Sequence, residues 1–84
     1  MNSVAAEVFL EYILHNILED TESLNIKKTI DELGTLFEIT VSASDMGRII
    51  GKSGQTIQSL RTLLRMMGAK NGERVNLKVL EPVA

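Results

Sequence analysis

The chain has 84 residues, contains no cysteine and carries a formal net charge of −2 at pH 7. This length allows one domain with a modest core, and the lack of cysteine excludes disulfides, thiolate nucleophiles and thiolate-bound metals. The longest apolar runs are a few residues long, far below the ~20 residues that span a bilayer, which predicts one soluble, cytoplasmic domain over residues 1–84.

The charges are distributed unevenly along the chain. Residues 44–74 hold six basic and two acidic side chains, a local net charge of +4, whereas the rest of the chain holds three basic and nine acidic side chains, a net charge of −6. The total charge taken alone argues mildly against a nucleic-acid partner. The asymmetry instead predicts one basic working face on an acidic body.

Residues 1–19 predict an N-terminal helix. Apolar side chains recur there at helical spacing, Ser3 is a candidate N-cap, and Glu7 lies in the first turns. The following pattern predicts a loop, an imperfect strand, a turn and a clean alternating strand, which occupy residues 20–23, 24–30, 31–34 and 37–41. The two strands are expected to pair as a hairpin.

Residues 44–68 predict two helices joined by a four-residue link. Ser44 is a candidate N-cap for the first helix, and Asp45 suits the positive end of its dipole. The first helix is brief because Gly51 stops it.

The second of these helices is expected to begin at Gln55 or Thr56 and to end at Gly68, which would act as a C-cap. Its core-facing stripe comprises Ile57, Leu60, Leu64 and Met67. A turn at residues 71–72 and an alternating strand at residues 75–79 follow. The order α-β-β-α-α-β predicts an α+β domain, in which three helices cover one face of a three-stranded sheet.

The link Gly51-Lys52-Ser53-Gly54 is the most informative segment of the sequence. Glycine at both ends permits a sharp bend and removes the β-carbons that would hold a ligand away. The following helix directs its first N–H groups and its positive dipole end toward the link, where phosphate oxygens fit. Lys52 adds a mobile positive charge and Ser53 a hydroxyl donor. A lone G-x-x-G is common, but the flanking helices and the nearby arginines favour a binding loop over a plain turn.

The segment Gly47-Arg48-Ile49-Ile50-Gly51-Lys52-Ser53-Gly54-Gln55-Thr56-Ile57 resembles the signature of KH domains. The predicted order of elements resembles the type II, prokaryotic-style arrangement of that family. The resemblance covers essentially the whole chain and is strongest to the small, single-domain bacterial KhpA family of RNA-binding proteins.

The resemblance implies that about four nucleotides of single-stranded RNA are clamped between the G-x-x-G loop and the sheet edge. The loop would contact the sugar–phosphate backbone, and three isoleucines would form an apolar floor for the bases. The implied contact residues, with two arginines close in sequence, are Arg48, Ile49, Ile50, Gly51, Lys52, Ser53, Gly54, Ile57 and Arg61. The segment 31–35 matches the family's variable loop by position.

The family resemblance also implies partners and a cellular role. Members bind RNA, self-associate as homodimers, and pair with a second KH-containing RNA-binding protein of the KhpB kind. They are linked to bacterial RNA regulation, RNA chaperone activity, cell elongation and division, and hence cell shape. None of these roles involves a cofactor or a small-molecule substrate.

Two features of the sequence bear on how RNA would be held. The low overall charge predicts few phosphate contacts, modest affinity and a shallow salt dependence. The aromatic residues Phe9, Tyr12 and Phe37 lie outside the motif. Base recognition is therefore expected to use apolar contacts and hydrogen bonds in place of aromatic stacking.

Enzymatic alternatives find little support in the sequence. The pattern G-x-x-x-x-G-K-[ST] of phosphate-binding loops requires glycine where Met46 stands. His15 is the only histidine and is expected to lie on a helix surface, with no Ser-His-Asp or metal-spaced cluster around it. The sequence predicts no catalytic residue, no bound metal and no enzyme.

A protein-interaction module is the main alternative to an RNA-binding protein. Leu63, Met66 and Met67 give the last predicted helix more apolar surface than one core stripe requires. Methionine adapts well to contact surfaces. These residues either fill the core or form the face of a homodimer or heterodimer with little RNA binding of its own.

Overall fold

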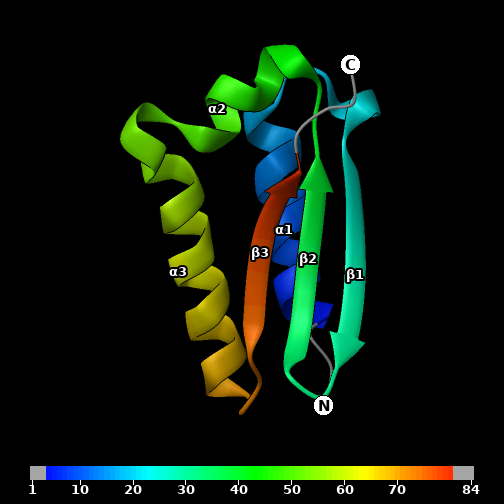
Figure 1. The fold of residues 1–84 in the computed structure, drawn as a ribbon, viewed down its shortest axis with the longest axis vertical. Helices are drawn as coiled ribbons and strands as arrows, with labels where there is room; N and C mark the ends of the chain where they lie inside the picture. Colours follow the sequence, from blue (N-terminus) through cyan, green and yellow to red (C-terminus); the bar gives the residue numbers. More distant parts are fainter. Residues whose placement is uncertain (1–3, 81–84) are drawn as a thin grey trace.

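The structure is a computed structural model that describes residues 4–80 (Figure 1). In this part of the chain, helices and strands follow in the order that the sequence predicts, which confirms the α+β fold of the type II KH kind. Their bounds are α1 Val4–Ile17, β1 Asn25–Asp31, β2 Gly34–Thr40, α2 Met46–Ile50, α3 Gln55–Lys70 and β3 Val75–Leu80. Short 3₁₀ turns occupy Thr21–Ser23, Ala43–Asp45 and Lys52–Gly54. The candidate N-cap Ser3 lies outside the described residues.

The sheet has the order β1-β2-β3, with β2 in the centre. β1 and β2 form the predicted antiparallel hairpin through a two-residue turn, and β3 lies parallel to β2. A parallel neighbour requires a crossover connection, which here is the α2–α3 unit. The bend between α2 and α3 consequently lies toward the end of the sheet where β2 and β3 finish (Figure 1).

One face of the sheet carries the core. Side chains along β2 alternate between half-buried and buried, and α1 lies across the buried face (Figure 1). Each fully buried aliphatic side chain contributes about 1.5–3 kcal/mol to folding. The apolar core side chains come from all three helices, from the sheet and from the residues that directly follow α1 and β2: Ala6, Leu10, Leu14, Leu18, Phe37, Ile39, Val41, Ile49, Ile57, Leu60, Leu64, Val75 and Leu77.

The end of α1 and the start of α2 differ from the prediction. α1 ends at Ile17, and the two Asp45 carboxylate oxygens accept the N–H groups of Glu19 (3.2 Å) and Asp20 (2.9 Å). Asp45 makes no capping hydrogen bond to α2, and Ser44 lies inside a 3₁₀ turn instead of capping that helix. The predicted N-cap at Ser44 is therefore wrong, because the chain enters α2 through this 3₁₀ turn and the Ser44 hydroxyl pairs with the Ser42 hydroxyl at 3.0 Å.

Gly68 does not end α3, which continues to Lys70. A β-carbon at Gly68 would lie 2.6 Å from Val75 Cγ2 and 2.8 Å from the carbonyl oxygen of Glu73. This glycine allows the last turns of α3 to approach the start of β3, so its role is close packing and not capping. The predicted core stripe is confirmed at Ile57, Leu60 and Leu64, while Met67 is half-buried.

Candidate nucleic-acid interface

The bend between α2 and α3 begins at Gly51. Its φ of 77° and ψ of 178° lie in a region that is essentially restricted to glycine. A β-carbon there would lie 2.7 Å from Thr56 Cβ and 2.8 Å from Thr56 N, and it would also collide with the Thr56 hydroxyl oxygen. Gly51 is therefore required by conformation and by space, because the first turn of α3 packs directly against it. The predicted helix stop at Gly51 is confirmed.

The bend ends with two residues in the left-handed region. Ser53 has φ 55° and ψ 28°, and Gly54 has φ 75° and ψ 14°. A β-carbon at Gly54 would meet no atom within 4 Å. The space beside Gly54 is thus open, whereas the space beside Gly51 is filled. Main-chain N–H groups in turns of this kind form concavities suited to anions.

The side chains in the middle of the bend are exposed. Lys52 and Ser53 both face solvent, and Lys52 forms no ion pair within residues 4–80. Gly54 is the N-cap residue of the 16-residue helix α3 and has no side chain with which to cap it. The Gly54 and Gln55 N–H groups donate to the Gly51 and Lys52 carbonyls, and the next N–H groups of an uncapped helix start carry its positive dipole end and donate to an external partner. The arrangement can therefore hold an anionic oxygen.

Asp45 ties the start of α2 to the chain beyond α1. The buried carboxylate accepts hydrogen bonds from the Glu19 and Asp20 main chain and from the Ser42 hydroxyl at 3.4 Å. The Asp20 N–H chiefly holds the pKa of Asp45 below its usual value of 3.8, helped by Glu19, Ser42 and Arg48 and opposed by burial. We call this group, formed by Asp45 with Glu19, Asp20, Ser42 and Arg48, the Asp45 clasp. No local sequence signal reveals it.

Arg48, one of the predicted contact residues, is engaged in the Asp45 clasp. Its guanidinium forms an ion pair with Glu19, and its Nε lies 3.7 Å from Asp45 Oδ1. The side chain is about half exposed, but two acidic neighbours compensate its charge. Arg48 accordingly contributes less positive potential to the bend than Lys52 does.

The three isoleucines of the predicted apolar floor differ in exposure. Ile49 is fully buried and Ile57 is 5% exposed, so neither offers a surface on which a base could lie. Ile50 is half-buried and packs at the margin of the core. Ile49 and Ile57 thus anchor the two ends of the bend in the core. Of the three isoleucines, Ile50 leaves the largest part of its side chain exposed next to the bend. The core stripe of α3 already predicts the burial of Ile57, but five-residue α2 shows too little periodicity to distinguish Ile49 from Ile50 by sequence.

Arg61 connects α3 to the edge of the sheet. Its Nε donates to the carbonyl oxygen of Leu77 in β3 at 3.0 Å, and its Nη1 donates to Gln58 Oε1 at 3.2 Å. The side chain is half-buried. Arg61 therefore lies between α3 and β3, along the flank of the helix that begins at the bend. The sequence places Arg61 near the motif but does not indicate this contact.

The segment 31–35 does not border the bend. The turn between β1 and β2 lies at the opposite end of the sheet from the α2–α3 bend (Figure 1). The connection that lines the α3–β3 flank is instead the segment 71–74, whose Arg74 carbonyl accepts the Thr35 N–H at 2.8 Å. Matching by position along the chain is misleading here, because the parallel crossover separates the two turns in space.

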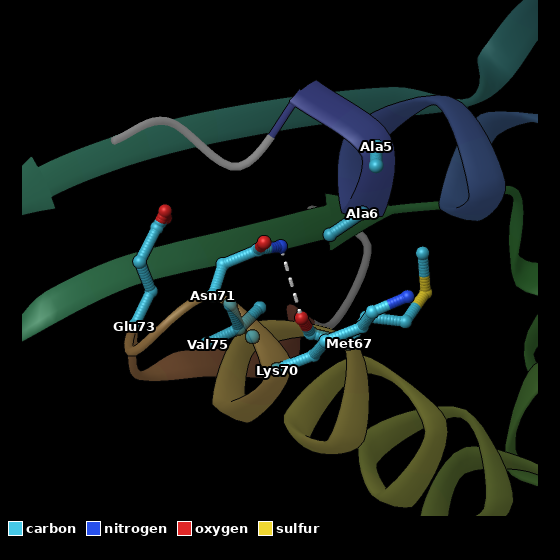
Figure 2. A pocket seen from close by; sticks show the side chains of 8 residues that line it. Ala5, Ala6, Met67, Lys70, Asn71, Glu73 and Val75 are labelled. Atoms are coloured by element: carbon cyan, nitrogen blue, oxygen red, sulfur yellow. Dashed lines mark hydrogen bonds between the residues drawn. The ribbon is translucent and has the colours of Figure 1, made fainter.

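A separate pocket lies on the other flank of α3, near α1. It has a volume of about 250 Å³, and the Asn71 amide at its wall donates to the Met67 carbonyl at 3.3 Å (Figure 2). Its lining consists of Ala5, Ala6, Met67, Gly68, Lys70, Asn71, Glu73 and Val75. None of the predicted contact residues belongs to it.

Features of other classes of protein are missing from the described part of the chain. Within residues 4–80, no three His, Cys, Asp or Glu side chains gather as a group able to hold a metal ion. The helices of this part are all too short or too polar to cross a membrane. His15 is exposed on α1, as expected.

Comparison with known proteins identifies the family. The family model for the KH domain of KhpA and KhpB matches residues 7–79. The RNA-binding protein KhpA of Chlamydia caviae is 38% identical over 73 residues, which cover 87% of this chain and 94% of that protein. The KhpA proteins of Borreliella burgdorferi and Listeria monocytogenes are 33% and 30% identical, over 86% and 82% of this chain and 88% and 91% of their own lengths. The chain belongs to the KhpA/KhpB family of KH domains.

Proposed function

We propose that this chain is a single-stranded RNA-binding protein that holds the RNA backbone at the Gly51–Gly54 bend. The observation that carries the proposal is the open, uncapped start of α3 beside Gly54. An anionic oxygen can approach main-chain N–H groups there without meeting a side chain. The name that these relatives share, RNA-binding protein KhpA, supports RNA as the polyanion.

The proposed mode of binding follows the chemistry of each residue. Phosphate oxygens accept hydrogen bonds from the main chain of the bend, while Lys52 and Ser53 add a charge and a hydroxyl. About four nucleotides then run between the bend and the β3 edge. Ile50 and the Arg61 guanidinium contact bases, and Ile49 and Ile57 keep the bend in position. Arg48 acts mainly through the Asp45 clasp.

The proposed setting is the bacterial cytoplasm. The protein would act in RNA regulation, with a link to cell elongation and division. It would bind RNA as a homodimer or together with a second KH-containing RNA-binding protein of the KhpB kind. Two linked binding sites raise apparent affinity, which suits a domain with few phosphate contacts.

Exposed apolar side chains favour a second candidate function, a protein-interaction module. Leu63 is 44% exposed and Met66 is 63% exposed on α3. Burying both would favour association by about 25 cal/mol for each Å² of apolar surface removed from water. Sedimentation at several concentrations tests this: concentration-dependent mass that disappears in a Leu63→Asp variant supports association through α3. A wild-type chain that stays monomeric at every concentration contradicts it.

The experiment that tests RNA binding is the substitution Gly54→Asp. A β-carbon at Gly54 would meet no atom within 4 Å, so the left-handed backbone should cost about 1 kcal/mol and leave the chain folded, while the new carboxylate repels phosphate where the bend would hold it. Fluorescence anisotropy with a labelled octanucleotide of single-stranded RNA should show affinity reduced by roughly tenfold or more. Unchanged affinity in a folded variant contradicts the proposal.

Gly72→Ala provides a matched control with Gly54→Ala. Gly72 has φ 71°, Gly54 has φ 75°, and neither β-carbon would meet another atom within 4 Å. Both substitutions should cost about 1 kcal/mol of stability through the same left-handed backbone. Gly54→Ala should weaken RNA binding more strongly than Gly72→Ala, because Gly72 lies beyond the other end of α3, away from the bend.

A further inference from the structure

Beyond Arg61, the flank of α3 that faces the sheet borders a cationic hollow. Arg61 and Arg65 are one helical turn apart and therefore lie on the same flank. The hydrogen bond from Arg61 to the Leu77 carbonyl fixes this flank as the one that faces β3. A pocket of about 350 Å³ follows it along α3, lined by Arg65, Ala69, Glu73, Arg74, Val75 and Asn76.

The edge of β3 presents main-chain groups to this flank. β3 is an outer strand of the sheet, and the Arg74 carbonyl accepts the Thr35 N–H of β2. Because peptide groups alternate along a strand, those of Val75 and Leu77 point to the outer side, which the Arg61 contact with Leu77 bears out. An outer strand offers donors and acceptors to a ligand.

The hollow carries uncompensated positive charge. Arg65 and Arg74 are exposed, and within residues 4–80 neither takes part in an ion pair. Glu73 also lines the hollow, and its Oε2 is buried without a hydrogen-bond partner. Two guanidinium groups and one carboxylate leave a net charge of +1. An arginine pair of this kind suits a phosphate, which accepts hydrogen bonds in forked geometry.

We propose that Arg65 and Arg74 form a second phosphate subsite, which holds the RNA strand beyond the part gripped at the Gly51–Gly54 bend. The inference rests on the proposed function and adds to it. Helix α3 rises about 15 Å from Gln55 to Arg65, so the two sites engage different phosphates of one strand. With this subsite, the bound RNA would extend from the bend, past Arg61, to Arg65 and Arg74.

The first test measures the salt dependence of RNA binding. In the double variant Arg65→Gln, Arg74→Gln, affinity for a single-stranded RNA octanucleotide should fall roughly fivefold. The slope of log affinity against log salt should become shallower by about 0.7 for each phosphate that the variant no longer neutralises. Lys27→Gln removes the same type of charge from the exposed outer face of β1 and should leave both quantities within about twofold of the wild type.

The second test locates the phosphate that the subsite holds. Each linkage of the octanucleotide is replaced in turn by a neutral methylphosphonate, and the decrease in affinity is measured for the wild type, Lys52→Gln and the Arg65→Gln, Arg74→Gln variant. Non-additive decreases identify which side chain meets which phosphate. Coupling of the arginine variant to a linkage different from the one that couples to Lys52 supports the subsite. Coupling of both variants to the same linkage, or none for the arginines, overturns it.

Replacing Glu73 should change RNA affinity in the opposite direction to the arginine variants. Glu73→Gln removes the carboxylate beside the two arginines and should tighten binding of the octanucleotide by roughly twofold. Weaker binding in this variant contradicts the subsite.

The two proposals fail in different ways. If Gly54→Asp abolishes binding while the arginine variant keeps the wild-type affinity and salt slope, the subsite is wrong and binding at the bend is supported. If the wild type binds no RNA, the proposed function fails, and the inference fails with it.

Discussion

The two ends of helix α2 are built in opposite ways. At its start, the Asp45 clasp pairs a buried carboxylate with two main-chain N–H groups, a hydroxyl and a guanidinium. At its end, the bend places Lys52 and Ser53 in solvent and follows them with an uncapped helix. Polar groups that are satisfied internally hold a segment in place, whereas exposed donors remain for a ligand. The comparison indicates that α2 is anchored at its start, whereas the chain after its end is left exposed.

Of all the predicted changes, we expect the largest in the free energy of unfolding when the two glycines of the bend are replaced one at a time. Gly51→Ala combines a forbidden backbone region with overlap against Thr56 and should lower the free energy of unfolding by about 3 kcal/mol. Gly54→Ala has open space and should cost about 1 kcal/mol. Chemical denaturation of both variants measures the difference. Equal destabilisation would mean that Thr56 does not pack against Gly51 as described.

Removing the charge of the Asp45 clasp should weaken the anchored end of α2. In Asp45→Asn, an amide group replaces one of the two oxygens that accept the Glu19 and Asp20 N–H groups, so a donor faces a donor. The thermal midpoint should fall, though by less than in Gly51→Ala. Wild-type stability in this variant would show that the clasp does not anchor α2.

The same group predicts how stability depends on pH. The pKa of Asp45 in the folded chain lies below its usual value of 3.8, so the ionised clasp contributes stability above that pH. The contribution is lost as the pH falls through the lowered pKa of the folded state. Urea unfolding from about pH 6 to about pH 2.5 should show this loss, and Asp45→Asn should show a shallower decline. Parallel profiles would contradict the assignment.

We expect the smallest changes, in RNA affinity, when the basic residues on either side of Gly51 are replaced. Lys52→Gln should weaken RNA binding roughly threefold and flatten the salt slope by about 0.7. Arg48→Gln should change RNA affinity by less than about twofold, because Glu19 and Asp45 already compensate this charge. Anisotropy titrations at several salt concentrations separate the two. A larger decrease for Arg48→Gln would place the main phosphate contact at α2 and not at the bend.

The order of elements could be predicted because it depends on local patterns. The alternation of Phe37 and Ile39 marks β2, the stripe from Ile57 to Leu64 marks α3, and the glycines mark the bend between helices. These signals lie within a few residues of the elements they specify. The same holds for the motif that carries the resemblance to KH domains.

Contacts between distant segments could not be predicted. Glu19 and Asp20, whose N–H groups Asp45 accepts, lie 26 and 25 positions before it, and Arg61 contacts Leu77 across 16 positions. Gly68 looks like a helix end in sequence, but its lack of a side chain admits Val75 of β3. The burial of Ile49, next to the half-buried Ile50, depends likewise on how α2 is anchored.

RNA binding at the bend requires that its main-chain N–H groups donate to phosphate oxygens of the RNA. The most direct measurement follows the backbone amide resonances of the ¹⁵N-labelled chain during titration with a single-stranded RNA octanucleotide. We expect the largest shifts on the amides of residues 52–55 and unchanged amides along β1, the strand at the far edge of the sheet. Saturable binding that leaves the amides of residues 52–55 unmoved would contradict it.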